Sequence, residues 1–215
     1  MDTPRVTIWG TGTPRSFRPL WMAEELGIRY QHKPIGPRTG ETQTPEYQQL
    51  NRKQKIPFVQ DGDVKLSESL AICRYLRDKY PSEQVLKPQD LFTKAKEDEW
   101  CCYIYGELDE TSLYVMRRHG DLSMIYGESE TTVNASRAYA EKHFEVVGQL
   151  LQARTYLVSD QFGLADLFLM SCIDWANTYQ VGLPDNLHNY HAHIAERPAY
   201  MRAMKLNYPD LFGGD

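Results

Sequence analysis

Two short segments of this chain hold residues whose types and spacing suit the binding of a small peptide. In the first, Ile56-Pro57 stands directly before the apolar run Phe58-Val59. Proline cannot donate a ladder hydrogen bond, so it belongs at the start or edge of a strand. If the bond before Pro57 is cis, the N–H and C=O of Ile56 face outward and can pair with an extended peptide. Pro57 taken alone favours the simpler interpretation, a proline that merely starts a strand.

The second segment, Ser67-Glu68-Ser69, lies where a strand pattern changes into a helix pattern. Free N–H groups at a helix start attract a carboxylate, and a serine hydroxyl adds a hydrogen bond. Glu68 can accept a hydrogen bond from an ammonium group, so the pair complements the head of a free amino acid. Simple helix capping by Ser67 or Ser69 stays open. Each segment alone is a weak signal, but the two segments in this order and at this spacing are a more specific one. Together they predict a tripeptide-binding site.

The pattern of the first eighty residues predicts the strands and helices that carry both segments. The order of predicted elements is strand, helix, strand, helix, two strands and helix, with a hairpin turn at Asp61-Gly62-Asp63. Their expected ranges are Val6–Trp9, Phe17–Leu26, Tyr30–Ile35, Glu46–Leu50, Phe58–Gln60, Val64–Leu66 and a helix face through Ile72, Leu76 and Tyr80. A helix between strands implies a parallel pair, and the hairpin adds antiparallel strands. We therefore expect an α/β domain of βαβαββα order over residues 1–80.

The rest of the chain reads as helical. Residues 81–90 contain two prolines and little periodicity, which indicates a linker. From 91 to 215 we find no convincing strand run, and Leu164–Trp175 is apolar almost all round, which is typical of a buried helix. Pro198–Leu206 predicts a last short helix that begins with proline. The sequence thus predicts an all-helical second domain over residues 91–215.

Composition narrows the function classes. The chain has 215 residues, 41% of them hydrophobic and 25% charged, with a net charge of -5 and a pI near 5.7. A nucleic-acid-binding protein would more often be basic, with clustered Lys and Arg. No apolar run is long enough to cross a bilayer, and no secretory signal opens the chain, so we expect no nucleic acid, no membrane and a cytoplasmic location. The four cysteines form no Cys-x-x-Cys pair and are expected to be reduced.

Two sets of motifs in this sequence resemble those of a known protein family. Asn51-x-x-x-Lys55-Ile56-Pro57, followed by Glu68-Ser69-Leu70-Ala71-Ile72-x-x-Tyr75-Leu76, resembles the cytosolic glutathione transferases, of the bacterial-like type with a Ser or Thr hydroxyl in the active site. Phe162-Gly163-Leu164-Ala165-Asp166 and Arg197-Pro198-Ala199 resemble the helical domain of that family. The resemblance covers nearly the full length. It implies a thioredoxin-like domain, a helical domain, a homodimer, glutathione as cosubstrate and no metal.

The resemblance also implies roles for the residues of the first signature. Pro57 would be cis, Ile56 would pair with the cysteinyl backbone of glutathione, and Glu68 and Ser69 would hold its γ-glutamyl end. Lys55 matches a position that often reaches the glycyl carboxylate, and a solvated lysine is the equal alternative.

The sequence departs from the family pattern at two positions. Gln54 stands where a glycine is common, so the local turn is expected to differ. Gly163 replaces the Ser or Thr that usually caps the buried helix, and Asp166 is expected to compensate by facing the first turn of that helix.

Activation of the thiol is expected in the turn Thr11–Ser16. A free thiol has a pKa near about 8.5, and hydrogen bonds to sulfur near a helix N-terminus favour the reactive thiolate. In related transferases of the hydroxyl type, serine stands where this chain has Thr13, whose hydroxyl would donate to the thiolate. Ser16 is a rival, although Pro19 places the predicted helix start nearby and favours Ser16 as a simple N-cap. Arg15 either stabilises a thiolate or an acidic substrate, or faces solvent.

Three residues are candidates for the second-substrate pocket, because the resemblance places them on helices that border it: Tyr103, Tyr105 and Arg117. A core or dimer contact is the alternative for each of them. The histidines at 188, 191 and 193 lie close together, but we interpret them as surface or capping residues rather than metal ligands.

The leading hypothesis is a glutathione transferase that activates the glutathione thiol for attack on an electrophilic small molecule. A non-catalytic glutathione- or ligand-binding protein of the same fold is the alternative. A glutathione-dependent thiol-disulfide reductase is disfavoured because no cysteine lies in the turn Thr11–Ser16.

Overall fold

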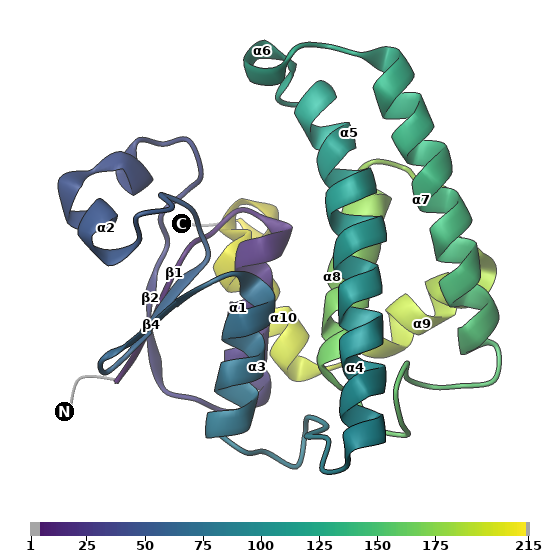
Figure 1. The fold of residues 1–215 in the computed structure, drawn as a ribbon, viewed down its shortest axis with the longest axis horizontal. Coiled ribbons are helices and arrows are strands. Elements are labelled where there is room, and N and C mark those ends of the chain that lie inside the picture. The colour runs from purple at the N-terminus through teal and green to yellow at the C-terminus, as the bar shows by residue number, and fades with distance from the viewer. Residues whose placement is uncertain (1–4, 214–215) are drawn as a thin grey trace. The chain divides into compact units, whose positions relative to one another are not determined.

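The computed structural model describes residues 5–213, which form two compact units (Figure 1). One unit holds the residues up to 87 together with those from 195 onward, and the other holds residues 88–194. The domain boundaries expected from the sequence stay a prediction, but one difference is clear. The C-terminal segment from 195, which we expected in the helical domain, packs in the first unit.

The first unit is built on a four-stranded sheet in the order β2-β1-β3-β4. The strands are β1 (Val6–Trp9), β2 (Tyr30–Lys33), β3 (Phe58–Asp61) and β4 (Val64–Ser67). β1 pairs parallel with β2 and antiparallel with β3, and β3 pairs antiparallel with β4. The predicted parallel pair and hairpin are therefore confirmed, with β2 two residues shorter than expected.

Helices cover both faces of this sheet. Figure 1 shows α1 (Pro14–Glu25) and α3 (Ser69–Lys79) on one side and the short α2 (Pro45–Leu50) on the other, and α10 (Pro198–Asn207) packs on α1. The 3-10 turns η1 (Glu41–Gln43) and η3 (Pro209–Phe212) precede α2 and follow α10. The core between α1, α3 and the sheet is made of fully buried side chains, among them Ile8, Leu20, Trp21, Val59, Ile72 and Leu76. The βαβαββα order predicted for residues 1–80 is confirmed.

The second unit is helical throughout its described residues. Its elements are α4 (Leu91–Tyr103), a π-helical stretch η2 (Ile104–Leu113), α5 (Tyr114–His119), α6 (Ser123–Tyr126), α7 (Glu130–Leu151), α8 (Leu164–Thr178) and α9 (Asp185–Ala195). The first three run on without a break, because the residues at their junctions keep right-handed helical dihedrals. The all-helical second domain predicted from the sequence is thus confirmed, but the π stretch was not foreseen; most π-helices are single-turn bulges.

The buried helix predicted at Leu164 is α8, and its start is capped as expected. Gly163 brings no side chain, and Asp166 accepts hydrogen bonds from the backbone N–H of Gly163 at 2.9 Å and of Leu157 at 2.8 Å. The Tyr190 hydroxyl donates a third bond at 2.8 Å. Burial raises the pKa of Asp166 to about 6, although these hydrogen bonds act in the opposite direction. Asp166 is therefore a structural residue of the helical unit.

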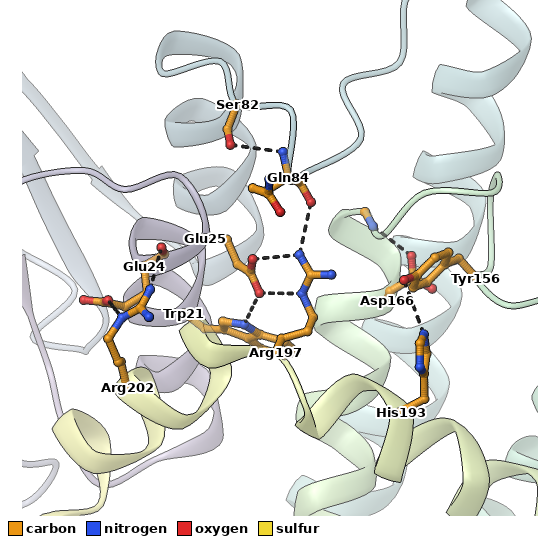
Figure 2. A network of polar contacts seen from close by, with 11 residues as sticks. Trp21, Glu24, Glu25, Ser82, Gln84, Tyr156, Asp166, His193, Arg197 and Arg202 are labelled. Carbon is orange, nitrogen blue, oxygen red and sulfur yellow. Dashed lines mark hydrogen bonds and ion pairs between the residues drawn. The ribbon is translucent and has the colours of Figure 1, made fainter.

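The C-terminal segment is held in the first unit by an ion pair between Arg197 and Glu25, the last residue of α1. Nε and Nη2 of Arg197 donate to the two carboxylate oxygens of Glu25 at 2.7 and 2.8 Å, and Nη2 also donates to the Gln84 carbonyl (Figure 2). Trp21 donates its indole N–H to the same carboxylate at 2.8 Å. These bonds explain why the segment belongs to the first unit although it follows the helical one in sequence.

None of the helices within residues 5–213 is both long and apolar enough to cross a membrane.

Candidate active site

The turn between β1 and α1 places Thr13 at the start of a helix. Thr13 is the N-cap of α1, and its Oγ1 accepts a hydrogen bond from the backbone N–H of Ser16 at 3.0 Å. Pro14 takes the first helical position, where its missing N–H is harmless. The helix therefore begins three residues before the predicted Phe17, and Pro19 lies inside it. The positive end of the helix dipole faces the Thr13 turn.

Ser16 is not the N-cap that its distance from Pro19 suggested. It is the third residue of α1, where its Oγ accepts from the Thr13 N–H at 3.2 Å and so closes a capping box. Ser16 is completely buried, whereas Thr13 keeps 7% of its surface exposed. The two hydroxyl oxygens lie 2.8 Å apart. Either hydroxyl can donate across this contact, and Thr13 keeps its own hydrogen for a group outside the turn only when it does not donate to Ser16. Arg15 lies between them in sequence, at the second position of the helix, and is half-buried.

The Ile56–Pro57 peptide bond is cis. Ile56 directly precedes this bond and β3 begins directly after it, so the junction lies at the end of a strand as expected. Among residues 5–213, neither the N–H nor the C=O of Ile56 has a hydrogen-bond partner within the protein. These groups are therefore open to pair with the backbone of a bound peptide.

Gly10 brings this junction close to the Thr13 turn. It has a φ of +124°, in the region that favours glycine. A Cβ added at Gly10 would lie 3.0 Å from Cβ of Ile56 and 3.1 Å from Cβ of Ser16. Ile56 and the start of α1 are thus in close approach on either side of Gly10, and any side chain at this position would push them apart.

The carbonyl of Lys55 anchors the loop before the cis bond. It accepts hydrogen bonds from the Tyr47 hydroxyl and from Nδ2 of Asn51, both at 2.8 Å. Gln54 has a φ of +53°, which explains why a glycine is common at this position in the family that the sequence resembles. The Lys55 side chain itself is exposed.

Glu68 and Ser69 stand at the start of α3, as the sequence predicted. Glu68 occupies the N-cap position with a φ of +75°, and Ser69 is the first helical residue. Ser69 is 4% exposed, and Nη1 of the fully buried Arg18 lies 3.4 Å from its Oγ. Ser67 ends β4 and does not cap the helix. The free N–H groups of α3 and the Ser69 hydroxyl therefore face the same corner of the unit.

Lys53 is a functional candidate that the sequence did not suggest. Its Nζ lies 2.8 Å from Oε1 of Glu68, and both side chains are 56% exposed. Lys53 thus already neutralises the carboxylate that was expected to receive an ammonium group. Fifteen residues separate the two in sequence, and no linear pattern connects them.

A second residue that the sequence did not suggest is Asn207, the last residue of α10. It is completely buried, and its side chain lies against Thr13 and Ser16. Its separation from the turn by more than 190 positions explains why no local signal pointed to it.

The three residues expected near a second substrate all lie in the helical unit. The Tyr103 hydroxyl is 2.6 Å from Nδ1 of His143 on α7, so this side chain is engaged within the unit. Burial, followed by the negative charge of Glu107, raises the pKa of Tyr103. Tyr105 is a half-buried residue of the π-helical stretch, and Arg117 lies half-buried in α5.

None of the four cysteines lies in the turn Thr11–Ser16. Cys73, Cys101 and Cys172 are buried free thiols, and Cys102 is exposed on α4. Burial raises the pKa of Cys73 strongly.

The clustered histidines make separate contacts. His191 is 2.9 Å from Asp174, and His193 lies 3.4 Å from the Tyr156 hydroxyl. Within the part of the chain that the structure describes, no group of three His, Cys, Asp or Glu side chains has the arrangement of a metal site.

Comparison with known proteins points to one family. Residues 4–78 match the family model of the glutathione S-transferase N-terminal domain, and residues 104–198 match that of the C-terminal domain. A glutathione S-transferase of Triticum aestivum is 30% identical over 218 residues, 98% of each chain. The glutathione S-transferase GstA of Escherichia coli O157:H7 is 28% identical over 74% of this chain and 77% of its own.

A solved structure agrees with these relatives. The theta class glutathione S-transferase from Xanthomonas axonopodis pv. citri, with glutathione bound, superposes with a TM-score of 0.80. The two chains are 26% identical, and the match covers 94% of this chain and 97% of the other.

Proposed function

Because the chain belongs to the glutathione S-transferase family and is a glutathione transferase with the thioredoxin-like fold of that family, we propose that Ile56, Glu68 and Ser69 bind glutathione and that Thr13 activates its thiol. The finer assignment of residues to roles is our own proposal. We also propose that the protein forms a homodimer and is located in the cytoplasm.

The observation that carries this proposal is the close approach of three features in the first unit. Ile56 and Ser16 lie on either side of Gly10, and the space between them is too small for a side chain at that position. Arg18, on the same helix as Ser16, reaches the hydroxyl of Ser69. One corner of the unit therefore holds three kinds of group that can bind a peptide. They are the free backbone groups of Ile56, the free N–H groups at the start of α3 and the Ser69 hydroxyl.

Each part of glutathione has a matching group in this corner. The γ-glutamyl carboxylate fits the Ser69 hydroxyl and the N–H groups at the start of α3, where the helix dipole is positive. Its ammonium group fits the Glu68 carboxylate. The cysteinyl backbone pairs with the N–H and C=O of Ile56, in the manner of an added strand. Lys55 is positioned one residue away to attract the glycyl carboxylate.

Thr13 then stabilises the sulfur in its charged form. Its hydroxyl donates a hydrogen bond to the thiolate, and the N-terminal dipole of α1 adds a favourable field. The thiol proton leaves to solvent. The thiolate uses an electron pair to form a carbon–sulfur bond with an electrophilic carbon, and the displaced group leaves with the electrons of the bond that breaks. Thr13 is a hydrogen-bond donor and not a covalent nucleophile.

The electrophile would be held by side chains of the helical unit. Tyr103, Tyr105 and Arg117 remain our candidates for that role.

One spectroscopic experiment tests this proposal. The ultraviolet absorbance of the glutathione thiolate is followed against pH in complexes with the wild-type protein, Thr13→Ser and Thr13→Ala. We expect a bound thiol pKa well below the free value of about 8.5 for the wild type and Thr13→Ser, and a pKa near the free value for Thr13→Ala. An unshifted pKa in the wild type would favour the non-catalytic binding protein. A shifted pKa that survives Thr13→Ala but is lost in Ser16→Ala would assign the role to Ser16.

A further inference from the structure

Asn207 contacts the catalytic turn through both its backbone and its side chain. Its carbonyl accepts hydrogen bonds from the Gly12 N–H at 2.8 Å and from the Thr11 hydroxyl at 3.0 Å. Its Nδ2 donates to the Thr13 carbonyl at 3.0 Å, and its Oδ1 accepts from the Ser16 hydroxyl at 2.9 Å. One residue from the far end of the chain thus makes four hydrogen bonds to residues 11–16.

The two side-chain bonds involve both members of the capping box. Thr13 and Ser16 bind one another through backbone and hydroxyl groups, and the Asn207 amide spans the pair from the buried side. Asn207 has no exposed surface, so it cannot touch a ligand. A buried amide with each of its polar atoms bonded to a different partner fixes those partners strongly, because leaving either one unpaired is costly.

The geometry of α10 explains how this residue reaches the turn. Arg197, just before α10, is paired with Glu25 at the end of α1, and Arg202 is paired with Glu24 at 2.6 Å (Figure 2). Asn207, at the end of α10, meets the start of α1. The two helices therefore run antiparallel, with these ion pairs near the end of α1 and Asn207 at its start.

We propose that Asn207 is a positioning residue that holds the Thr13 hydroxyl in the place where it stabilises the glutathione thiolate. This inference rests on the proposed role of Thr13. It predicts that the Asn207 side chain affects the pKa of the bound thiol more than it affects the binding of glutathione, because the groups proposed to hold the peptide lie at Ile56, Glu68 and Ser69.

The test compares Asn207→Ala and Asn207→Asp with Arg202→Ala, a change at the same α1–α10 interface that does not touch the turn. The thiolate absorbance of the full-length protein with glutathione is measured against pH, together with the dissociation constant of glutathione and the thermal midpoint. For Asn207→Ala we expect a bound thiol pKa about one unit higher, hence up to about tenfold less thiolate below that pKa. The dissociation constant should change less than about threefold, which is a small binding effect.

Asn207→Asp keeps the size of the side chain, so it provides a second measurement if the alanine variant does not fold. Its carboxylate cannot donate to the Thr13 carbonyl and adds a negative charge near the sulfur, so we expect a thiol pKa at least as high as in Asn207→Ala. Arg202→Ala should leave the pKa unchanged. A wild-type pKa in a folded Asn207 variant, or an equal rise in Arg202→Ala, would overturn the inference. If Thr13→Ala also keeps the wild-type pKa, the proposed role of Thr13 fails instead.

Discussion

Nζ of Lys53 lies 2.8 Å from Oε1 of Glu68, and the two side chains form an ion pair. The Glu68 carboxylate is the group that we propose binds the ammonium group of glutathione. The two cations compete for one partner. Both side chains are 56% exposed, and such ion pairs contribute only about 0.2–1 kcal/mol. The Lys53–Glu68 ion pair should therefore lower the affinity for glutathione only slightly.

Replacing Lys53 by Gln should tighten glutathione binding. We expect a dissociation constant lower by about 1.5- to 5-fold, the equivalent of one exposed ion pair. Isothermal titration calorimetry would measure it. In a Glu68→Ala background the same replacement should have no effect, because the contested carboxylate is gone. Weaker binding in Lys53→Gln would show that Lys53 itself contacts the ligand.

Ser69→Ala should weaken glutathione binding more than Glu68→Ala does. Ser69 is 4% exposed, so a buried ligand carboxylate that loses its hydroxyl donor costs about 1–3 kcal/mol. The more exposed Glu68 should contribute no more than about 1 kcal/mol. The matched control is Ser67→Ala, a neighbouring hydroxyl at the end of β4. Equal affinities for the Ser67 and Ser69 variants would remove Ser69 from the binding site.

Loss of the Arg197 side chain should destabilise the first unit strongly. The Glu25 carboxylate is only 4% exposed, and removing one partner of a buried pair costs about 3–5 kcal/mol. Arg202→Ala breaks a pair whose arginine is 54% exposed, so it should cost no more than about 1 kcal/mol. Denaturant unfolding of both variants measures the difference. Similar losses in both would contradict the structural role given to Arg197.

His32 should make the stability of the first unit depend on pH. Burial lowers the pKa of His32 below its ordinary value of 6.5, although a hydrogen bond with the Gly10 carbonyl acts in the opposite direction. The unfolded chain therefore binds this proton at a higher pH than the folded one. The stabilisation is present above about pH 6.5 and is lost as the pH falls below it.

The corresponding measurement is the free energy of unfolding at about pH 7.5 and pH 5.5 for the wild type and His32→Gln, on either side of the histidine pKa. The loss at the lower pH should be smaller in the variant, since glutamine does not titrate. An identical loss in both proteins would assign the pH dependence to other groups.

Local patterns in the sequence predicted most of the fold, because strands, hairpin turns and apolar helix faces are set by neighbouring residues. The hairpin at Asp61-Gly62-Asp63 and the capping of α8 by Asp166 were both foreseen. The start of α1 was misplaced, because Pro19 was expected only in a first turn, whereas Thr13 and Pro14 nucleate the helix earlier. The π-helical stretch left no recognisable signal, since its composition resembles that of an ordinary helix.

The sequence predicted the positions of the residues proposed to bind glutathione, but not the contacts that support them. Ile56, Pro57, Glu68 and Ser69 form short motifs whose spacing survives in a linear sequence. Lys53 and Asn207 act through space, one across a hairpin and the other from the opposite end of the chain. Such residues are identified only when the fold brings them together.

The most direct test of glutathione binding at this corner is a crystal structure of the protein with glutathione. We predict that the cysteinyl backbone pairs with the N–H and C=O of Ile56, that the γ-glutamyl carboxylate lies at Ser69, and that the sulfur lies within hydrogen-bonding distance of Oγ1 of Thr13. Glutathione bound elsewhere, or a sulfur held by a group other than Thr13, would contradict the account.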